Sequence, residues 1–188
     1  MSAELKQFLS QYTDFTDSTL NEVMSKFKTR ELKKNDFLLE EGHPCNDFVF
    51  VQSGCLRMFY VNEETEVSVW FAFAHSSAIE ISSFISGRPS EYSIQAIEDC
   101  TVFYLPKTEL NKLYETHPDM QTMMRKFWED AILQLLKRFT ALQKDSAEKR
   151  YTDLMNNTDY VQKIPQKYLA SFIGVTPTSL SRIRRHIK

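Results

Sequence analysis

Apolar residues recur along the chain with two different periods, and the change of period predicts the order of its elements. Two segments before residue 28 repeat an apolar residue every three or four positions, which predicts two short amphipathic helices. From about residue 32 to residue 105 the period falls to two, as at Val67, Val69 and Phe71. Short strands with frequent turns and no long helix between them predict an antiparallel jelly roll.

The helical period returns after Pro106, and Pro118 opens a long helix that we expect to reach about Asp145. The apolar residues of this helix form two adjacent rows. One row contains Met120, Met124, Phe127 and Ala131, and the other contains Trp128, Ile132, Leu135, Phe139 and Leu142. One row is expected to cover the barrel while the other meets a partner helix. The alternative is a helix buried wholly in its own subunit, but a helix this long outreaches a small barrel.

A helix over residues 147–157, broken at residues 156–159, precedes a pattern typical of two helices joined by one tight turn. Pro165 suits the first position of a helix, and Gly174 ends that helix with the left-handed conformation that glycine adopts easily. Thr176 is a good N-cap and Pro177 a good first residue for a second helix. The second helix has an apolar stripe of Leu180, Ile183 and Ile187. This pattern predicts a helix-turn-helix.

The solvent face of the second helix carries the chemistry for DNA recognition. It presents short hydroxyl side chains and arginines, which reach base edges in the major groove. The candidate DNA-binding residues are Thr176, Thr178, Ser179, Ser181, Arg182 and Arg185. We expect Ser179 and Arg182 to read bases, and Thr176 and Arg185 to touch phosphates. The alternative is an ordinary helical hairpin with a basic face.

Charge favours DNA binding, because it is distributed unevenly. Residues 161–188 contain six lysines and arginines and no acidic residue, although the whole chain has a net charge of −2. A basic segment replaces the counterions of phosphates, and an acidic body avoids the duplex. The 42% apolar content is typical of a globular protein. No signal-peptide core and no membrane-spanning run is evident, so we expect a cytoplasmic protein with no membrane partner.

The predicted fold class is α+β. We expect an antiparallel β-roll sensor domain over residues 1–118, a long dimerisation helix over residues 119–145 and a small helix-turn-helix domain over residues 146–188 that lacks an evident wing. Cys45, Cys55 and Cys100 are isolated in sequence, so they are interpreted as buried small apolar residues rather than metal ligands. We expect no cofactor and no metal.

This combination resembles the Crp/Fnr family of bacterial transcription regulators over nearly the whole chain. The most specific matches are Phe48-Val49 followed by Gly54 and Leu56-Arg57, the segments 86–90 and 96–100, and the terminal motif. The resemblance implies that an effector binds the β-roll, that the central helix forms a homodimer and that paired recognition helices read a palindromic DNA site. RNA polymerase is a further implied partner.

The chain departs from the family pattern in the effector pocket. Nucleotide-binding members carry a Gly-Glu pair before a short pocket helix and an Arg-Ser pair after it, and here these pairs fall on Ile79-Glu80 and Ser90-Glu91. The ribose-type carboxylate remains, but the phosphate-binding arginine is absent and a carboxylate would repel a phosphate. The positions on the central helix whose hydroxyl groups contact the base in nucleotide-binding members are occupied here by Leu135 and Leu136. The pocket is therefore interpreted as remodelled or vestigial, its effector is unknown and cyclic AMP is not expected. Glu80 has a purely structural alternative as a helix N-terminal acid.

Two other departures bear on function. The cysteine group of the cluster-binding members is absent, and the chain ends directly after the recognition helix, where family members continue into a β-hairpin wing. Without that wing, we expect fewer phosphate contacts and weaker or more salt-sensitive DNA binding.

Two other classes of function are less consistent with the sequence. Jelly-roll oxygenases need two histidines and a carboxylate at one site, and the four histidines here form no H-x-H pair. No Ser-His-Asp or P-loop signature is present. We therefore expect no enzymatic activity. A ligand-sensing or partner-binding β-roll protein without DNA binding is the second alternative, and the basic face of the last helix argues against it.

Overall fold

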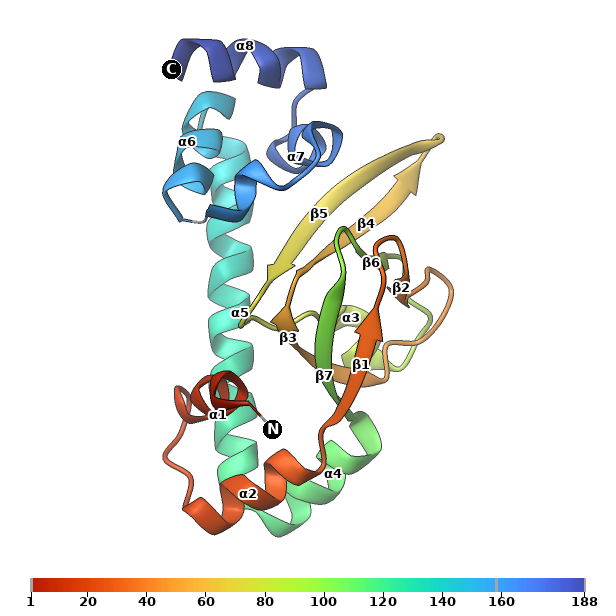
Figure 1. Ribbon diagram of the computed structural model, residues 1–188, viewed down its shortest axis with the longest axis vertical. Helices are drawn as coiled ribbons and strands as arrows, with labels where there is room; N and C mark the ends of the chain where they lie inside the picture. Colours follow the sequence, from red (N-terminus) through yellow and green to blue (C-terminus); the bar gives the residue numbers. More distant parts are fainter. Residues whose placement is uncertain (1, 158, 188) are drawn as a thin grey trace. The chain divides into compact units, whose positions relative to one another are not determined.

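A computed structural model describes residues 2–157 and 159–187 (Figure 1). The chain forms two compact units. The first contains Met1–Met58 and Phe71–Asp130, and the second contains Phe59–Trp70 and Ala131–Lys188. The mixture of helices with antiparallel strands confirms the predicted α+β class. Among the described residues, no helix is both long and apolar enough to cross a membrane.

In the described part of the chain, seven strands form the two sheets of the β-roll. The strands are β1 (Lys28–Leu32), β2 (Phe37–Leu39), β3 (Asp47–Ser53), β4 (Cys55–Asn62), β5 (Thr65–Phe73), β6 (Ser93–Ala96) and β7 (Cys100–Pro106). One sheet has the order β1-β7-β3 and the other has the order β2-β6-β4-β5. In the first sheet all pairs are antiparallel, with Phe50 opposite Phe103. The antiparallel roll predicted from the period-two pattern is confirmed.

Strand β1 begins earlier than the apolar pattern indicates. Its first four residues are exposed, and only Leu32 is buried. Such a strand is held by its backbone hydrogen bonds to β7 rather than by apolar burial, so it leaves no alternation in the sequence. Gly54, between β3 and β4, has φ of +89°, and a Cβ there would lie 2.6 Å from the carbonyl oxygen of Asp99. Only glycine fits this turn without strain.

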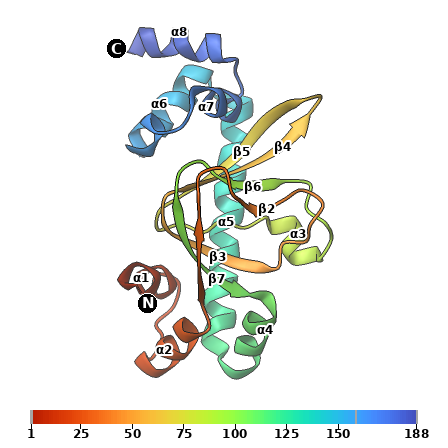
Figure 2. The ribbon, with the colours of Figure 1, turned by 45° about the vertical axis from the view of Figure 1, so that its right-hand side comes forward.

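Short helices and the first half of a long helix pack around the roll. They are α1 (Ala3–Ser10), α2 (Asp17–Ser25), α3 (Ile81–Ser86), α4 (Lys107–Thr116) and α5 (Pro118–Lys144). Figure 2 shows α1, α2 and α4 beside the lower part of α5. Met120, Met124 and Phe127 are almost fully buried, as expected for the row that covers the barrel. The Phe127 ring lies 5.1 Å from Phe48 in β3 and 6.2 Å from Phe8 in α1.

The second unit contains the end of α5 and the predicted helix-turn-helix. After α6 (Ala147–Asn157) and the 3-10 helix η1 (Asp159–Gln162), α7 spans Gln166–Ile173 and α8 spans Pro177–Ile187. Gly174 has the expected left-handed conformation, with φ of 75°. The amide of Ser179 donates to Thr176 Oγ1 at 3.2 Å, so Thr176 is the N-cap of α8.

Two details of this unit differ from the expectations. Pro165 is the N-cap of α7 rather than its first helical residue, because its ψ of 135° is extended. Ile187 is 41% exposed, so the buried stripe of α8 is shorter than predicted. The predicted break at residues 156–159 includes Thr158, which lies outside the described residues, as does Lys188 of the basic segment.

Candidate nucleic-acid interface and effector pocket

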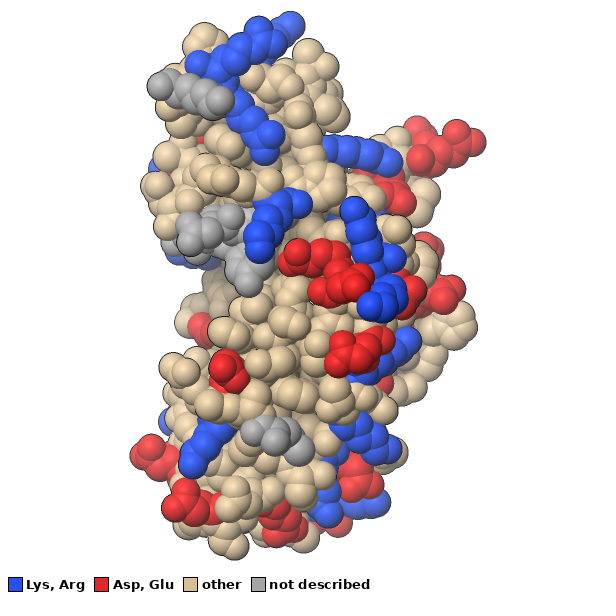
Figure 3. All heavy atoms as spheres, in the orientation of Figure 1, with Lys and Arg blue, Asp and Glu red and all other residues tan. Residues whose placement is uncertain are grey.

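The outer face of α8 carries three of the predicted DNA-binding residues at helical spacing. Thr178, Arg182 and Arg185 are exposed and lie four and three positions apart, so they share one face of the helix. Thr176 is also exposed, and Ser179 is half-buried. Figure 3 shows lysine and arginine side chains over this end of the second unit. An exposed helix face with two arginines and a threonine can approach the edges of base pairs in a DNA groove.

The two serines of α8 make contacts inside the unit. Ser179 Oγ lies 3.0 Å from Thr176 Oγ1, within the N-cap. Ser181 Oγ donates to the carbonyl oxygen of Pro177 at 3.1 Å and accepts from Gln166 Nε2 at 2.6 Å. Gln166 Nε2 also donates to the same Pro177 carbonyl at 2.8 Å. Ser181 therefore joins α8 to α7 and does not belong to the exposed row.

Arg184 belongs to the same basic run but has a different role. Its Nε donates to the Tyr151 hydroxyl at 3.2 Å, and its guanidinium lies 5.7 Å from the centroid of the Tyr151 ring. Tyr151 is buried in α6. Arg184 thus holds α6 against α8, while Arg182 and Arg185 remain on the outer face. Sequence reasoning did not find Gln166 or Tyr151, because both contacts depend on the packing of the three helices.

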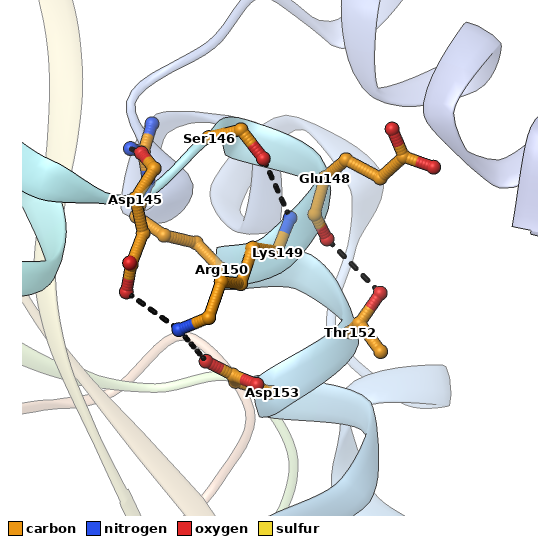
Figure 4. A network of polar contacts seen from close by, with 7 residues as sticks. All are labelled: Asp145, Ser146, Glu148, Lys149, Arg150, Thr152 and Asp153. Atoms are coloured by element: carbon orange, nitrogen blue, oxygen red, sulfur yellow. Dashed lines mark hydrogen bonds and ion pairs between the residues drawn. The ribbon is translucent and has the colours of Figure 1, made fainter.

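Polar contacts fix the junction between α5 and α6. Ser146 Oγ accepts from the amide of Lys149 at 3.2 Å, and Lys149 Nζ lies 3.0 Å from Asp145 and 3.2 Å from Asp153 (Figure 4). The hydrogen bond to Asp145 is the largest cause that raises the pKa of Lys149. This lysine is exposed, so solvent screens its ion pairs and they add little stability. The contacts define the turn through which the chain leaves α5.

The predicted effector-pocket carboxylate caps its own helix. Glu80 is 5% exposed, and its side chain accepts from the amides of Ser82 at 2.9 Å and Ser83 at 2.7 Å. Both carboxylate oxygens therefore bind the N-terminus of α3. To bind a ribose hydroxyl, the carboxylate must either accept a third hydrogen bond or give up one of these two.

The loop after α3 satisfies its own hydroxyl groups in the same way. Ser90 is 3% exposed, and its Oγ donates to the carbonyl of Tyr92 at 2.8 Å and accepts from the Tyr92 amide at 3.0 Å. Ser83 Oγ donates to the carbonyl of Arg88 and accepts from the Cys45 amide at 2.8 Å. Glu91 is exposed. Ser90 thus has its donor and its acceptor within the loop, whereas Ser83 of α3 has one partner in the loop and one at Cys45, before β3.

The other two predicted pocket residues lie in the second unit. Leu135 is 46% exposed and Leu136 is 55% exposed on α5. Their side chains offer no hydroxyl for a nucleotide base.

Two cations of the β-roll were not singled out as site residues from the sequence. Arg57 in β4 is fully buried, and its Nη2 donates to Gln95 Oε1 at 3.4 Å. Lys107 donates to the carbonyl of Phe84, at the end of α3, and lies 5.1 Å from the centroid of the Phe84 ring. Phe84 in turn lies 5.9 Å from Trp128 of α5. Arg57 thus connects β4 to β6, and Lys107 connects the start of α4 to α3.

The cysteines and histidines offer no metal site in the described part of the chain. No group of three or more His, Cys, Asp or Glu residues there lies close enough together to hold a metal ion. Cys45, Cys55 and Cys100 are buried free thiols. Burial raises the pKa of each thiol, to about 11 for Cys100, so these cysteines are poor nucleophiles at neutral pH.

Comparison with known proteins supports the class defined by this fold. Residues 29–117 match the family model of the cyclic nucleotide-binding domain. The chain is 24% identical over 139 residues to the transcriptional activator protein Anr of Pseudomonas aeruginosa; the alignment covers 74% of this chain and 56% of that protein.

Two examples show that solved structures share the fold. FixK2 from Bradyrhizobium japonicum matches with a TM-score of 0.72 and 16% identity, over 86% of this chain and 84% of that chain. A Crp/Fnr-family regulator from Eubacterium rectale matches with a TM-score of 0.72 and 15% identity, over 96% and 87%. The roll is thus a cyclic nucleotide-binding-type domain. With its long helix and terminal helix-turn-helix, the chain shares the fold of these two regulators over most of its length.

The capping role of Glu80 leads to a test of stability. Glu80→Ala removes the acceptor of two amides, so we expect the free energy of unfolding to fall by about 1–2 kcal/mol. Glu91→Ala, which removes an exposed carboxylate from the neighbouring loop, is the matched control and should change it by less than about 0.5 kcal/mol. Urea denaturation measures both values. Equal stability of the two variants would contradict the capping role.

Proposed function

We propose that the protein is a DNA-binding transcriptional regulator that acts as a homodimer on a palindromic site. The observation that carries this proposal is the exposed row of Thr178, Arg182 and Arg185 on α8, and the similarity to the transcriptional activator Anr and to the Crp/Fnr-family structure supports it. Arg182 is suited to bidentate contact with guanine, and Arg185, one turn further on, to phosphate contact. Thr176 lies at the start of α8, where a phosphate also benefits from the helix dipole, and Ser179, three residues further on, is proposed to read a base. No catalytic role is proposed.

The homodimer is supported by the second apolar row of α5. Beyond Asp130 this helix exposes large apolar side chains: Ile132 is 55% exposed, Leu135 46%, Leu136 55%, Phe139 58% and Leu142 42%. These positions recur every three or four residues, which is the spacing of a helix-pairing seam. A contiguous apolar row of this kind on a soluble protein is typical of an interface with another chain.

The proposed regulator does not depend on a cyclic nucleotide. Glu80 and Ser90 are bonded to backbone groups of their own segments, and the phosphate-binding arginine is absent. A cyclic phosphate needs a cation and several donors to replace its water. Ser90 and Glu91 supply no cation for the phosphate. We therefore propose that the amount of protein, rather than a nucleotide, sets the extent of regulation.

The DNA contacts can be tested by substituting the two outer arginines separately. A palindromic site is first selected from a pool of random DNA, and gel shifts then compare that site with unrelated DNA. Arg182→Ala should weaken binding to the selected site by about 1–3 kcal/mol and relax the preference for one base pair. Arg185→Ala, the matched control, should weaken binding to both DNAs alike. An equal loss on both DNAs for Arg182→Ala would show that Arg182 contacts only phosphate.

The dimer can be tested by placing a charge in the exposed apolar row. Leu135→Glu should convert the dimer to a folded protomer, because burying an unpaired carboxylate in an apolar interface has an effective cost of several kcal/mol. Gln134 is exposed and lies on the side of the helix opposite the row, so Gln134→Glu is the control that should stay dimeric. Sedimentation velocity at micromolar concentration gives the masses. A monomeric wild-type protein would rule out this interface.

Isothermal titration calorimetry tests the proposed independence from nucleotides. We expect no binding of cyclic AMP or cyclic GMP at millimolar concentration, because a lost charge-assisted contact alone weakens affinity by about 1.5–3 kcal/mol. If either nucleotide bound at micromolar concentration, and Glu80→Ala weakened that binding, the proposed independence from nucleotides would be wrong.

A further inference from the structure

Two arginines from different helices bind the last carbonyl groups of α7. Arg138, in α5, donates from Nη2 to the carbonyl oxygen of Phe172 at 2.9 Å. Arg150, in α6, donates from Nε and Nη2 to the carbonyl oxygen of Ile173 at 3.0 Å and 2.8 Å. The last four carbonyls of a helix have no partner within it, and its C-terminus attracts positive charge. These two arginines therefore occupy the end of α7 that lies next to the turn of the helix-turn-helix.

The backbone satisfies the other two terminal carbonyls of α7. The amide of Gly174 donates to Ala170 and Ser171, and the amide of Val175 donates to Ala170 at 3.0 Å. With the arginines added, each of the four final carbonyls of this helix has a donor. The arginine side chains thus connect the end of α7 to α5 and α6, in addition to the backbone hydrogen bonds that cap the helix.

Each guanidinium makes a second contact that fixes its direction. Arg138 stacks over the Phe172 ring, with its Cζ 3.6 Å from the ring centroid. Arg150 also donates from Nη1 to the carbonyl of Asp145, in the turn between α5 and α6. A planar guanidinium with several fixed donors holds its partners in one geometry, unlike a lysine. Arg150 consequently connects the turn after α5 directly to the end of α7.

Burying a guanidinium group costs free energy, which indicates that Arg138 and Arg150 serve to orient the helices rather than to add stability. Burial and the nearby charge of Arg150 lower the pKa of Arg138 to about 10, so it is still charged at neutral pH. Within the described residues, the acceptors of both guanidinium groups are backbone carbonyl oxygens rather than carboxylates. Apolar side chains of similar size often fill such a site at lower cost. What they do not provide is a directional bond to a particular carbonyl.

We propose that Arg138 and Arg150 are positioning residues that set the angle between α5 and the helix-turn-helix. This inference rests on the proposed function, because in the homodimer that angle sets the distance between the two copies of α8. Two recognition helices must meet half-sites separated by about one turn of DNA, roughly 34 Å. A rigid pair binds both half-sites as one bivalent unit, whereas a loosely hinged pair loses much of that gain. Neither arginine needs to touch DNA for this effect.

The first experiment measures DNA geometry. Arg138→Met and Arg150→Met keep much of the length of the side chain but remove its charge and donors. Arg125→Met is the control, because Arg125 also lies on α5 but makes only an exposed ion pair with Glu129, at 2.5 Å. Fluorescence anisotropy compares the selected palindrome, a single half-site, and palindromes with one or two base pairs added or removed between the half-sites.

We expect each variant to bind the palindrome about tenfold more weakly while its half-site affinity stays within about twofold of the wild type. The dependence on spacing should flatten in both variants and remain sharp in Arg125→Met. A sharp spacing dependence in Arg138→Met and Arg150→Met would overturn the proposal. Equal losses on half-site and palindrome, with a lower Tm, would show instead that the arginines act only in folding.

A second measurement does not require DNA. Spin labels at Lys137→Cys on α5 and His186→Cys on α8 report the distance between these helices within one protomer, in samples diluted with unlabelled protein. The three native cysteines are buried. We expect a narrow distance distribution that broadens when Arg138 or Arg150 is replaced. An unchanged distribution would refute the inference, whereas a wild-type protein that binds no DNA would refute the proposed function alone.

Discussion

The packing of Phe127 against the β-roll is the contact on which the rest of the structure depends. Its ring meets Phe48 at 5.1 Å and Tyr12 at 5.9 Å, and it lies next to Trp128, which contacts the short helix α3 through Phe84. Aromatic contacts of this kind combine a large buried area with a preferred edge geometry. They fix the first half of α5 on the roll and leave its second half available for other contacts.

Polar groups divide between the two units in a way that fits their proposed roles. In the roll, Glu80 and Ser90 are satisfied by nearby backbone, so they stabilise the loop that they belong to. In the second unit, Arg138, Arg150 and Arg184 reach across from one helix to another. The first arrangement holds a helix N-terminus and a loop in place, and the second arranges helices around an exposed basic face.

The apolar period of the sequence was sufficient to predict the roll, the long helix and the helix-turn-helix. Exposed β1 escaped prediction because backbone pairing, which leaves no apolar pattern, holds it. The site was predicted less completely. Arg182 and Arg185 lie on the outer face as expected, but Ser181 bonds to Gln166 instead, because that contact depends on how closely α7 approaches α8. Arginines that bind carbonyl oxygens, such as Arg150, have no partner that sequence spacing reveals.

The exposed apolar row of α5 has a consequence for how the protein accumulates. A protomer without its proposed partner presents Leu136, Phe139 and their neighbours to water, and such a surface favours aggregation and capture by chaperones. The concentration of dimer depends on the square of the concentration of free protomer, so the paired fraction rises gradually as the total concentration passes the dissociation constant. In the cell, a chain of this design would therefore be better protected from clearance when it is abundant than when it is scarce.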